Sequence, residues 1–292
     1  MHLSSGFEGA DEFETSLTVA NRIDVAVLGG LDGHTQPELS GSVSALSASG
    51  NNLYFLDRGT GQLLHINLVT MEAKVLTVIR DGESKGLIAT TDGSVYIVDR
   101  SDRSIVSWMP FDVEPRRMST SKLFTSPTDI ALTDWGRSLI AVDDLEMQIL
   151  VMDIYGYELR PVQTGPVRSS HVTSMLAVGA TNDNIFVLDA DANEVVGFDL
   201  QGNPVGSYAT DELSHATAFA VDPCGRFFVA DDGDENIYVG FADMVLPGFR
   251  TPAPELTAAS TNDLWTDGSF LYAATELDGI FVYAIDPECV IR

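Results

Sequence analysis

A short apolar run that ends at the same polar position recurs along this chain of 292 residues. Neighbouring copies lie 42 to 46 residues apart, and a second apolar run opens six residues after each. The residues that end the six copies are Asp57, Asp99, Asp143, Asp189, Asp231 and, in the last copy, Thr275. Such short β-rich runs, bounded by polar turns, predict strands. Their regular spacing predicts an array of similar β-units.

The fourth repeat shows what one unit contains. Apolar runs at Ser174–Val178, Ile185–Leu188, Val195–Leu200 and Val205–Tyr208 are separated by polar turns. The second run is apolar throughout, which is typical of a strand that is buried on both faces. Four antiparallel strands in a unit of this length predict the blade of a β-propeller.

The ends of the chain predict how the ring closes. The sixth repeat stops after its third strand, Phe281–Ile285, while Ser16–Gly30 contains a spare apolar run. We expect this N-terminal segment to pair with the last blade, because an unpaired strand edge favours aggregation. The chain is therefore predicted to be all-β: a mobile acidic N-terminus over 1–14, then a single six-bladed propeller domain over 15–292, closed by an N-terminal strand.

The third repeat carries a resemblance to a known family. It reads Pro127–Leu132, then Gly136, then Leu139–Asp143, then Ile149–Met152. This order of proline, strand, glycine turn and Val-Asp resembles NHL-repeat proteins and the wider group of TolB-like six-bladed propellers. The chain departs from the family's Asn-Arg before the third strand, where only Arg103 keeps an arginine. The resemblance implies architecture; the family includes lyases, lactonases and binding modules, so it does not decide function.

The charge of the chain limits its partners. It has 43 acidic and 16 basic residues, a net charge of −27. Such a field repels phosphate backbones, so we expect no nucleic-acid partner, and it favours a protein partner with a basic surface. No apolar stretch approaches the roughly 20 residues that cross a bilayer. The start of the chain, Met1–Ser4, does not resemble a signal peptide, so we expect any leader to be absent from this chain.

The recurring aspartates have two interpretations. A ring of carboxylates could bind metal, or each carboxylate could accept backbone N–H groups and close its own hairpin. Recurrence at the same place in every repeat favours the structural role.

The start of each inner strand should line the central channel, where propeller sites commonly lie. Register places Asp129, His171, His215, Asn262 and Asp263 there as channel-lining candidates. Neighbouring channel positions by the same register are Ser42, Ser44, Lys85, Thr128, Thr173 and Thr217. Blades three and six lie opposite each other, so Asp129 and Asp263 could face one another. Such a set could hold calcium or another divalent metal, as in six-bladed lactonases. However, no glutamate opens an inner strand, and no Pro-His pair precedes one. We assign no catalytic residue.

The two cysteines are predicted to form a disulfide. Cys224 lies in a turn between the first and second strands of blade five, and Cys289 follows the third strand of blade six. Strands alternate in direction within a blade, so both positions should share one face of the ring. A Cys224–Cys289 bond would indicate an oxidising compartment: periplasmic, cell-surface or secreted.

Two functional hypotheses remain open. The first is a non-enzymatic binding or scaffold propeller outside the cytoplasm, without a cofactor, that mediates protein–protein interaction. The alternative is a metal-dependent hydrolase or lyase, similar to a lactonase, with its site at the central channel. Whether the chain is an enzyme stays open at this stage.

Overall fold

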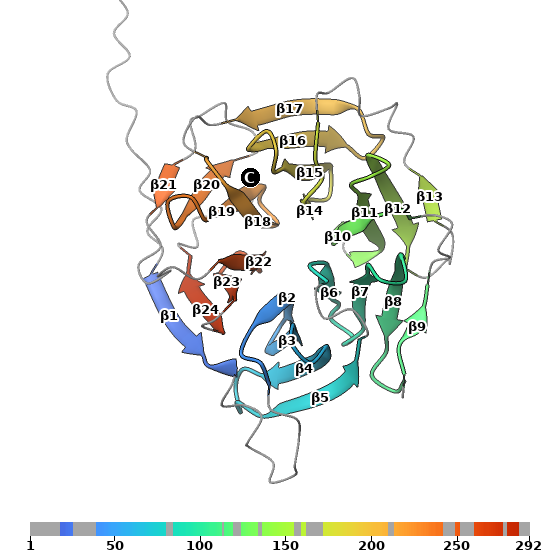
Figure 1. Cartoon of the computed structure of the whole chain (residues 1–292), viewed down its shortest axis with the longest axis vertical. Helices are drawn as coiled ribbons and strands as arrows, with labels where there is room; N and C mark the ends of the chain where they lie inside the picture. Colours follow the sequence, from blue (N-terminus) through green and yellow to red (C-terminus); the bar gives the residue numbers. More distant parts are fainter. Residues whose placement is uncertain are drawn as a thin grey trace, which may run out of the picture.

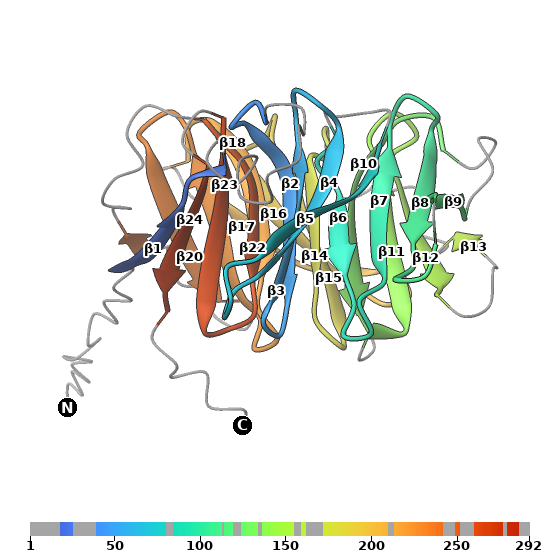
Figure 2. The same cartoon turned by 90° about the horizontal axis from the view of Figure 1, so that it is seen from below.

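Six four-stranded antiparallel sheets form a ring in the computed structural model (Figure 1). The structure describes residues 18–25, 39–79, 84–112, 114–118, 124–133, 136–154, 159–161, 172–209, 213–241, 249–251, 260–276 and 279–285. Side-on, the sheets stand beside one another with their strands along the ring axis (Figure 2). This arrangement is a six-bladed β-propeller, as the repeat predicts.

Each blade runs from an inner strand at the axis to an outer strand at the rim. Blade one contains β2 (Val43–Ser49), β3 (Asn52–Asp57), β4 (Gln62–Asn67) and β5 (Ala73–Val78). Blade two contains β6 (Leu87–Ala89), β7 (Val95–Asp99), β8 (Ser104–Trp108) and β9 (Arg116–Arg117). Blade three contains β10 (Pro127–Thr133), β11 (Ser138–Asp143), β12 (Gln148–Asp153) and β13 (Leu159–Pro161).

The second half of the ring repeats this order. Blade four contains β14 (Ala177–Ala180), β15 (Asn184–Asp189), β16 (Glu194–Asp199) and β17 (Pro204–Ala209). Blade five contains β18 (Ala216–Val221), β19 (Arg226–Asp231), β20 (Asn236–Phe241) and β21 (Phe249–Thr251). Blade six contains β22 (Thr261–Thr266), β23 (Phe270–Thr275), β24 (Ile280–Ala284) and, from the other end of the chain, β1 (Thr18–Ile23).

The core lies between neighbouring blades. Phe186 on β15 and Phe227 on β19, for example, belong to one buried cluster that joins blades four and five. Because each second strand packs on both sides, it has no polar face, which explains the continuous apolar runs of the repeat.

The N-terminal strand closes the ring, as predicted. β1 pairs antiparallel with β24, from Thr18 opposite Ala284 to Ile23 opposite Ile280. Ile23 and Val25 are buried in the cluster between blades six and one. The predicted mobile segment, 1–14, lies outside the described residues.

One inner strand begins later than predicted. β14 starts at Ala177 rather than at Ser174. The reason is that the backbone N–H of Ser174 donates to Asp189 and that of Met175 donates to Asp144, so these residues bond turn carboxylates before the strand begins.

The recurring aspartates close their hairpins, as the structural interpretation predicts. Asp143 is buried and accepts backbone N–H groups from Thr125, Ser126 and Glu146. The carboxylate therefore fixes both its own turn and the segment that leads into the inner strand, a second link that the sequence did not predict.

A left-handed residue precedes the third strand of every blade. The six residues are Gly61, Arg103, Met147, Asn193, Glu235 and Gly279, all with φ between 49° and 80°. These hairpins therefore hold this position in the left-handed conformation in every blade, whether or not the residue there is glycine.

Among the described residues, no helix is long and apolar enough to cross a membrane.

Candidate functional site: the central channel

Four of the six inner strands carry a β-bulge where they begin. The pairing of four inner strands with their neighbours shifts by one residue, and the residues skipped are Ser44, Thr128, Thr217 and Asn262. A bulge redirects side chains and is often found beside functional sites. The residues that follow the bulge are Ala45, Asp129, Ala218 and Asp263. Opposite blades three and six therefore carry carboxylates where blades one and five carry alanine.

The first carboxylate bridges blade three to blade four. Thr128 Oγ1 donates to the carbonyl of Met175 at 2.6 Å, and Asp129 Oδ2 accepts from the N–H of Val178 at 2.8 Å. The other oxygen, Oδ1, accepts from the N–H of Ile130 at 2.7 Å. We call the two contacts to blade four an inter-blade bridge.

The second carboxylate forms the same bridge from blade six to blade one. Asn262 Nδ2 donates to the carbonyl of Val43 at 2.8 Å, and Asp263 Oδ2 accepts from the N–H of Leu46 at 2.8 Å. Asp263 Oδ1 accepts from the N–H of Leu264 at 2.9 Å. The two bridges share one pattern on opposite sides of the ring.

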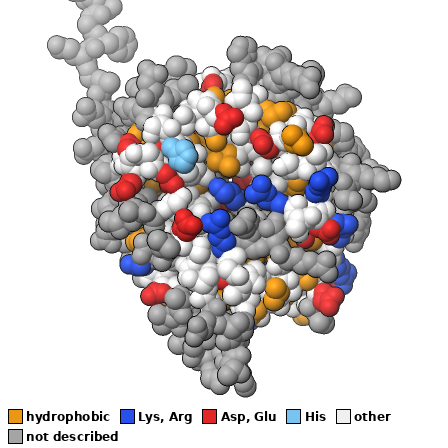
Figure 3. Space-filling view, in the orientation of Figure 1, with side chains coloured by type: hydrophobic (Ala, Val, Ile, Leu, Met, Phe, Trp, Pro, Cys, Tyr) orange, Lys and Arg blue, Asp and Glu red, His pale blue; other side chains and the backbone are white. Residues whose placement is uncertain are grey.

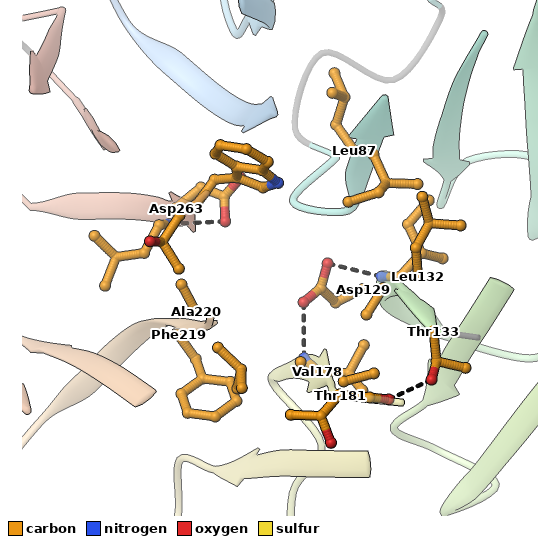
Figure 4. A pocket seen from close by; sticks show the side chains of 18 of the residues that line it. Leu87, Asp129, Leu132, Thr133, Val178, Thr181, Phe219, Ala220 and Asp263 are labelled. Carbon is orange, nitrogen blue, oxygen red and sulfur yellow. Dashed lines mark hydrogen bonds between the residues drawn. The ribbon is translucent and has the colours of Figure 1, made fainter. Parts of the chain in front are cut away.

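Asp129 and Asp263 face the same chamber on the axis (Figure 4). Its volume is about 540 Å³, and it extends from the two carboxylates along the inner strands to their C-terminal ends. Every inner strand contributes a large apolar residue to its wall: Leu46, Leu87, Ile130, Val178, Phe219 and Leu264. Trp265, which follows Leu264 on β22, also lines it. The chamber is thus apolar. Its two carboxyl groups lie at the end nearest the start of the inner strands, which we call its inner end.

Burial changes the acidity of this pair. It raises the pKa of Asp129 to about 7, against the lowering effect of its backbone hydrogen bonds and of Lys85. Burial, and next the charge of Asp129, raise the pKa of Asp263 well above its ordinary value. Each carboxyl group therefore opposes ionisation of the other.

Lys85 lies beside the pair. Burial lowers the pKa of its ammonium group, while Asp263 and Asp129 raise it. Arg100 adds a lowering contribution and Asp232 a raising one. The next residue, Gly86, explains how this lysine reaches the site: a Cβ there would lie 2.6 Å from Val98 Cγ2 and 2.9 Å from the Cα of Asp129. Only glycine lets blade two approach Asp129 so closely.

Lys and Arg side chains gather around the centre of the face on which the inner strands begin (Figure 3). Lys85 precedes an inner strand on this face, and Arg58 and Arg100 follow second strands that end on it. Arg58 also pairs with Glu276 of blade six at 3.3 Å. This mouth is therefore basic, in contrast to the net charge of the chain.

The histidine candidates do not join the pair within the described structure. His215 is exposed at the start of β18, and its backbone N–H donates to Asp231. His171 lies outside the described residues, as does Cys289, so the Cys224–Cys289 disulfide stays a prediction. Within the described ranges, no group of three or more His, Cys, Asp or Glu side chains is arranged to hold a metal ion.

The apolar chamber was not predicted from the sequence. The sequence signal for it was a large apolar residue two positions after the bulge in each of the four bulged inner strands, such as Leu46 after Ser44. That pattern resembles ordinary core, because periodicity does not distinguish a side chain that fills a core from one that lines a cavity.

Comparison with known proteins gives the class of fold and no more. No protein-family profile matches the chain, and no curated protein sequence does. Among solved structures, a protein of unknown function from Bacteroides thetaiotaomicron is similar, with a TM-score of 0.65 and 16% identity over 94% of this chain and 77% of that one. Virginiamycin B lyase from Staphylococcus aureus has a TM-score of 0.62 and 12% identity over 87% and 83%. A structure of the nidogen–laminin complex has a TM-score of 0.56 and 20% identity, over 77% of this chain and 84% of that one. At these identities the likeness defines a six-bladed propeller and leaves function open.

Proposed function

We propose that this chain is a non-enzymatic binding propeller of the cell envelope or extracellular space that mediates protein–protein interaction. One observation carries the proposal: the polar groups at the axis hold the ring together. Thr128, Asp129, Asn262 and Asp263 all bond the backbone of the next blade. Side chains in the position expected for chemistry thus have a structural task.

The partner we propose is a protein with a basic surface. Asp191 and Glu235 are exposed on the hairpins of adjacent blades four and five, on the face where the inner strands begin. With a net charge of −27, the chain attracts such a surface at long range. The nidogen–laminin structure supports the idea that a propeller of this shape can belong to a protein complex. The extracytoplasmic location rests on the predicted disulfide.

Charge reversal tests this proposal. The wild type should capture partner proteins from an envelope extract of the source organism, and the double variant Asp191→Lys/Glu235→Lys should not capture them. Quantitative mass spectrometry measures the captured amounts. The matched control, Glu72→Lys/Asp183→Lys, changes two exposed acids in turns on the opposite face and should keep them. Capture of the same proteins by all three forms, or of none by the wild type, would overturn the proposal.

A metal-dependent hydrolase or lyase at the channel is the second candidate. One observation favours it: the pKa of Asp129 is about 7, so its carboxyl group can transfer a proton near neutral pH. Elemental analysis of the purified protein, with thermal shifts in calcium and zinc, decides between the two. Stoichiometric metal that is lost in Asp129→Asn would replace the binding proposal with this one; absence of both metal and a thermal shift would reject it.

A further inference from the structure

We propose that the central chamber binds a small amine, with its apolar body against the chamber wall and its protonated amino group between Asp129 and Asp263. This site is separate from the protein-binding surface proposed above. It therefore stands or falls independently of that function.

The size and lining of the chamber fit a small molecule. Its volume of about 540 Å³ lies within the usual range for small-molecule sites. The wall is made of aliphatic side chains with two aromatic residues, Phe219 and Trp265. Such a surface favours an apolar body, and an indole also favours a neighbouring cation.

The charges at the inner end favour a cationic head. Five charged groups contribute there: the basic Lys85 acts on the acidic Asp129 and Asp263, and the basic Arg100 and the acidic Asp232 act on Lys85. With every group ionised, one negative charge is uncompensated. An unpaired buried charge is costly, so the empty site should retain a proton on the carboxyl pair. A ligand ammonium group can take the place of that proton and pair the charge.

Other head groups fit less well. An anion would add to the repulsion within the pair, and a neutral group would leave the pair protonated. The carboxylates still have acceptor capacity, because each oxygen accepts one backbone N–H and an ionised carboxylate offers about four acceptor positions.

We expect the amine to enter from the face on which the inner strands end, because the chamber extends toward that face. On the opposite face Lys and Arg side chains gather around the centre and repel a cation, and Lys85 and Arg100 belong to strand ends on that face. The chamber extends toward the other face, where hydroxyl-bearing residues Thr133, Thr181 and Thr266 line its end. A cation that enters there meets the carboxylates before it meets the basic groups.

Three probes with the same six-carbon tail test the proposal: n-hexylamine, 1-hexanol and hexanoate. Isothermal titration calorimetry with the full chain should show that hexylamine binds at least about tenfold more tightly than hexanol, and that hexanoate binds most weakly. In buffers of different ionisation enthalpy, hexylamine should release up to about one proton per site near pH 6.

The pH dependence separates this site from non-specific binding without any mutation. Hexylamine stays protonated from about pH 5 to 8, while the pair ionises, so its affinity should rise across this range and that of hexanol should stay constant. Asp263→Asn should remove the preference for hexylamine, whereas Asp183→Asn, at an exposed turn, should keep it. Equal affinities for hexylamine and hexanol, affinity for hexylamine that does not change with pH, or no binding of hexylamine at about 10 mM would overturn the proposal.

Discussion

Asp129 on blade three and Asp263 on blade six face each other across the central channel, and each accepts a backbone N–H from the blade that follows it. The same two side chains thus stabilise two blade interfaces and form the acidic end of the chamber. A change at either position should therefore be visible in both stability and ligand binding.

Asp129→Asn should alter how stability depends on pH. The folded pKa of about 7 lies above the ordinary value of 3.8, so the folded protein keeps a proton that the unfolded chain releases. The stability that protonated Asp129 contributes to the folded protein is fully present below about pH 4 and is lost as the pH rises through about 7. The shift corresponds to about 4 kcal/mol at most. In urea unfolding, the free energy of unfolding of the wild type relative to that of Asp129→Asn should therefore increase from about pH 8 to pH 5.

The control for that experiment is Asp183→Asn, because Asp183 is exposed in a turn. It should follow the wild type at both pH values. A constant free-energy difference between the wild type and Asp129→Asn would show that Asp129 is ionised in the folded protein throughout.

Asp143→Ala should destabilise the protein by about 2 kcal/mol, because three backbone N–H groups lose their acceptor. Asp189→Ala should behave alike, since Thr173, Ser174 and Ala192 donate to it. Chemical denaturation measures both, and Asp183→Ala serves as the exposed control. Hexylamine binding should survive in both variants below their melting temperatures; its loss with unchanged stability would contradict a purely structural role.

Gly279→Ala should weaken ring closure. A Cβ at Gly279 would lie 2.3 Å from the carbonyl oxygen of Ile23, on the closing strand β1. Gly136 is the matched control, since its φ of 81° resembles the 80° of Gly279 and a Cβ there meets nothing within 4 Å. Differential scanning calorimetry should show a larger loss for Gly279→Ala; equal losses would mean that only backbone strain matters.

Truncation tests the same closure. Deletion of 1–14 should leave the melting temperature almost unchanged, whereas deletion of 1–30 removes β1 and exposes the edge of β24. Identical melting of both truncated chains and the full chain would contradict closure by this strand.

Glu235→Gly should stabilise the protein by roughly 0.5–1 kcal/mol, because Glu235 is held at a φ of 59° that glycine adopts without strain. Glu72→Gly changes an exposed glutamate whose φ is not positive, so it should be neutral or destabilising. Thermal unfolding compares the two, and destabilisation by Glu235→Gly would mean that side-chain contacts outweigh backbone strain.

The predicted Cys224–Cys289 bond should leave no reactive thiol in the denatured, non-reduced chain. Cross-linking a segment of this length constrains the unfolded chain by about 4 kcal/mol in the loop-entropy model. Thiol titration in guanidinium measures the result directly. Two reactive thiols per chain would refute the bond and remove the basis for an extracytoplasmic location.

Most of the architecture could be predicted from the sequence, because it is local and repeated. The apolar runs that end at Asp57 or Asp143 define second strands, and the truncated sixth repeat predicts closure by the N-terminal segment. The start of β14 was misplaced because the N–H groups of Ser174 and Met175 bond the side chains of Asp189 and Asp144. Periodicity does not report such contacts.

The sequence by itself determined the number of blades, the order of strands within each and the turn role of the aspartates, because these depend on neighbours within one repeat. Only the tertiary structure decided that Asp263 bonds Leu46, which is 217 positions away, and that Lys85 lies beside both carboxyl groups. Ring closure brings these residues together. Burial at the axis then sets their charge, since the free energy of an ionised group depends on what surrounds it in space.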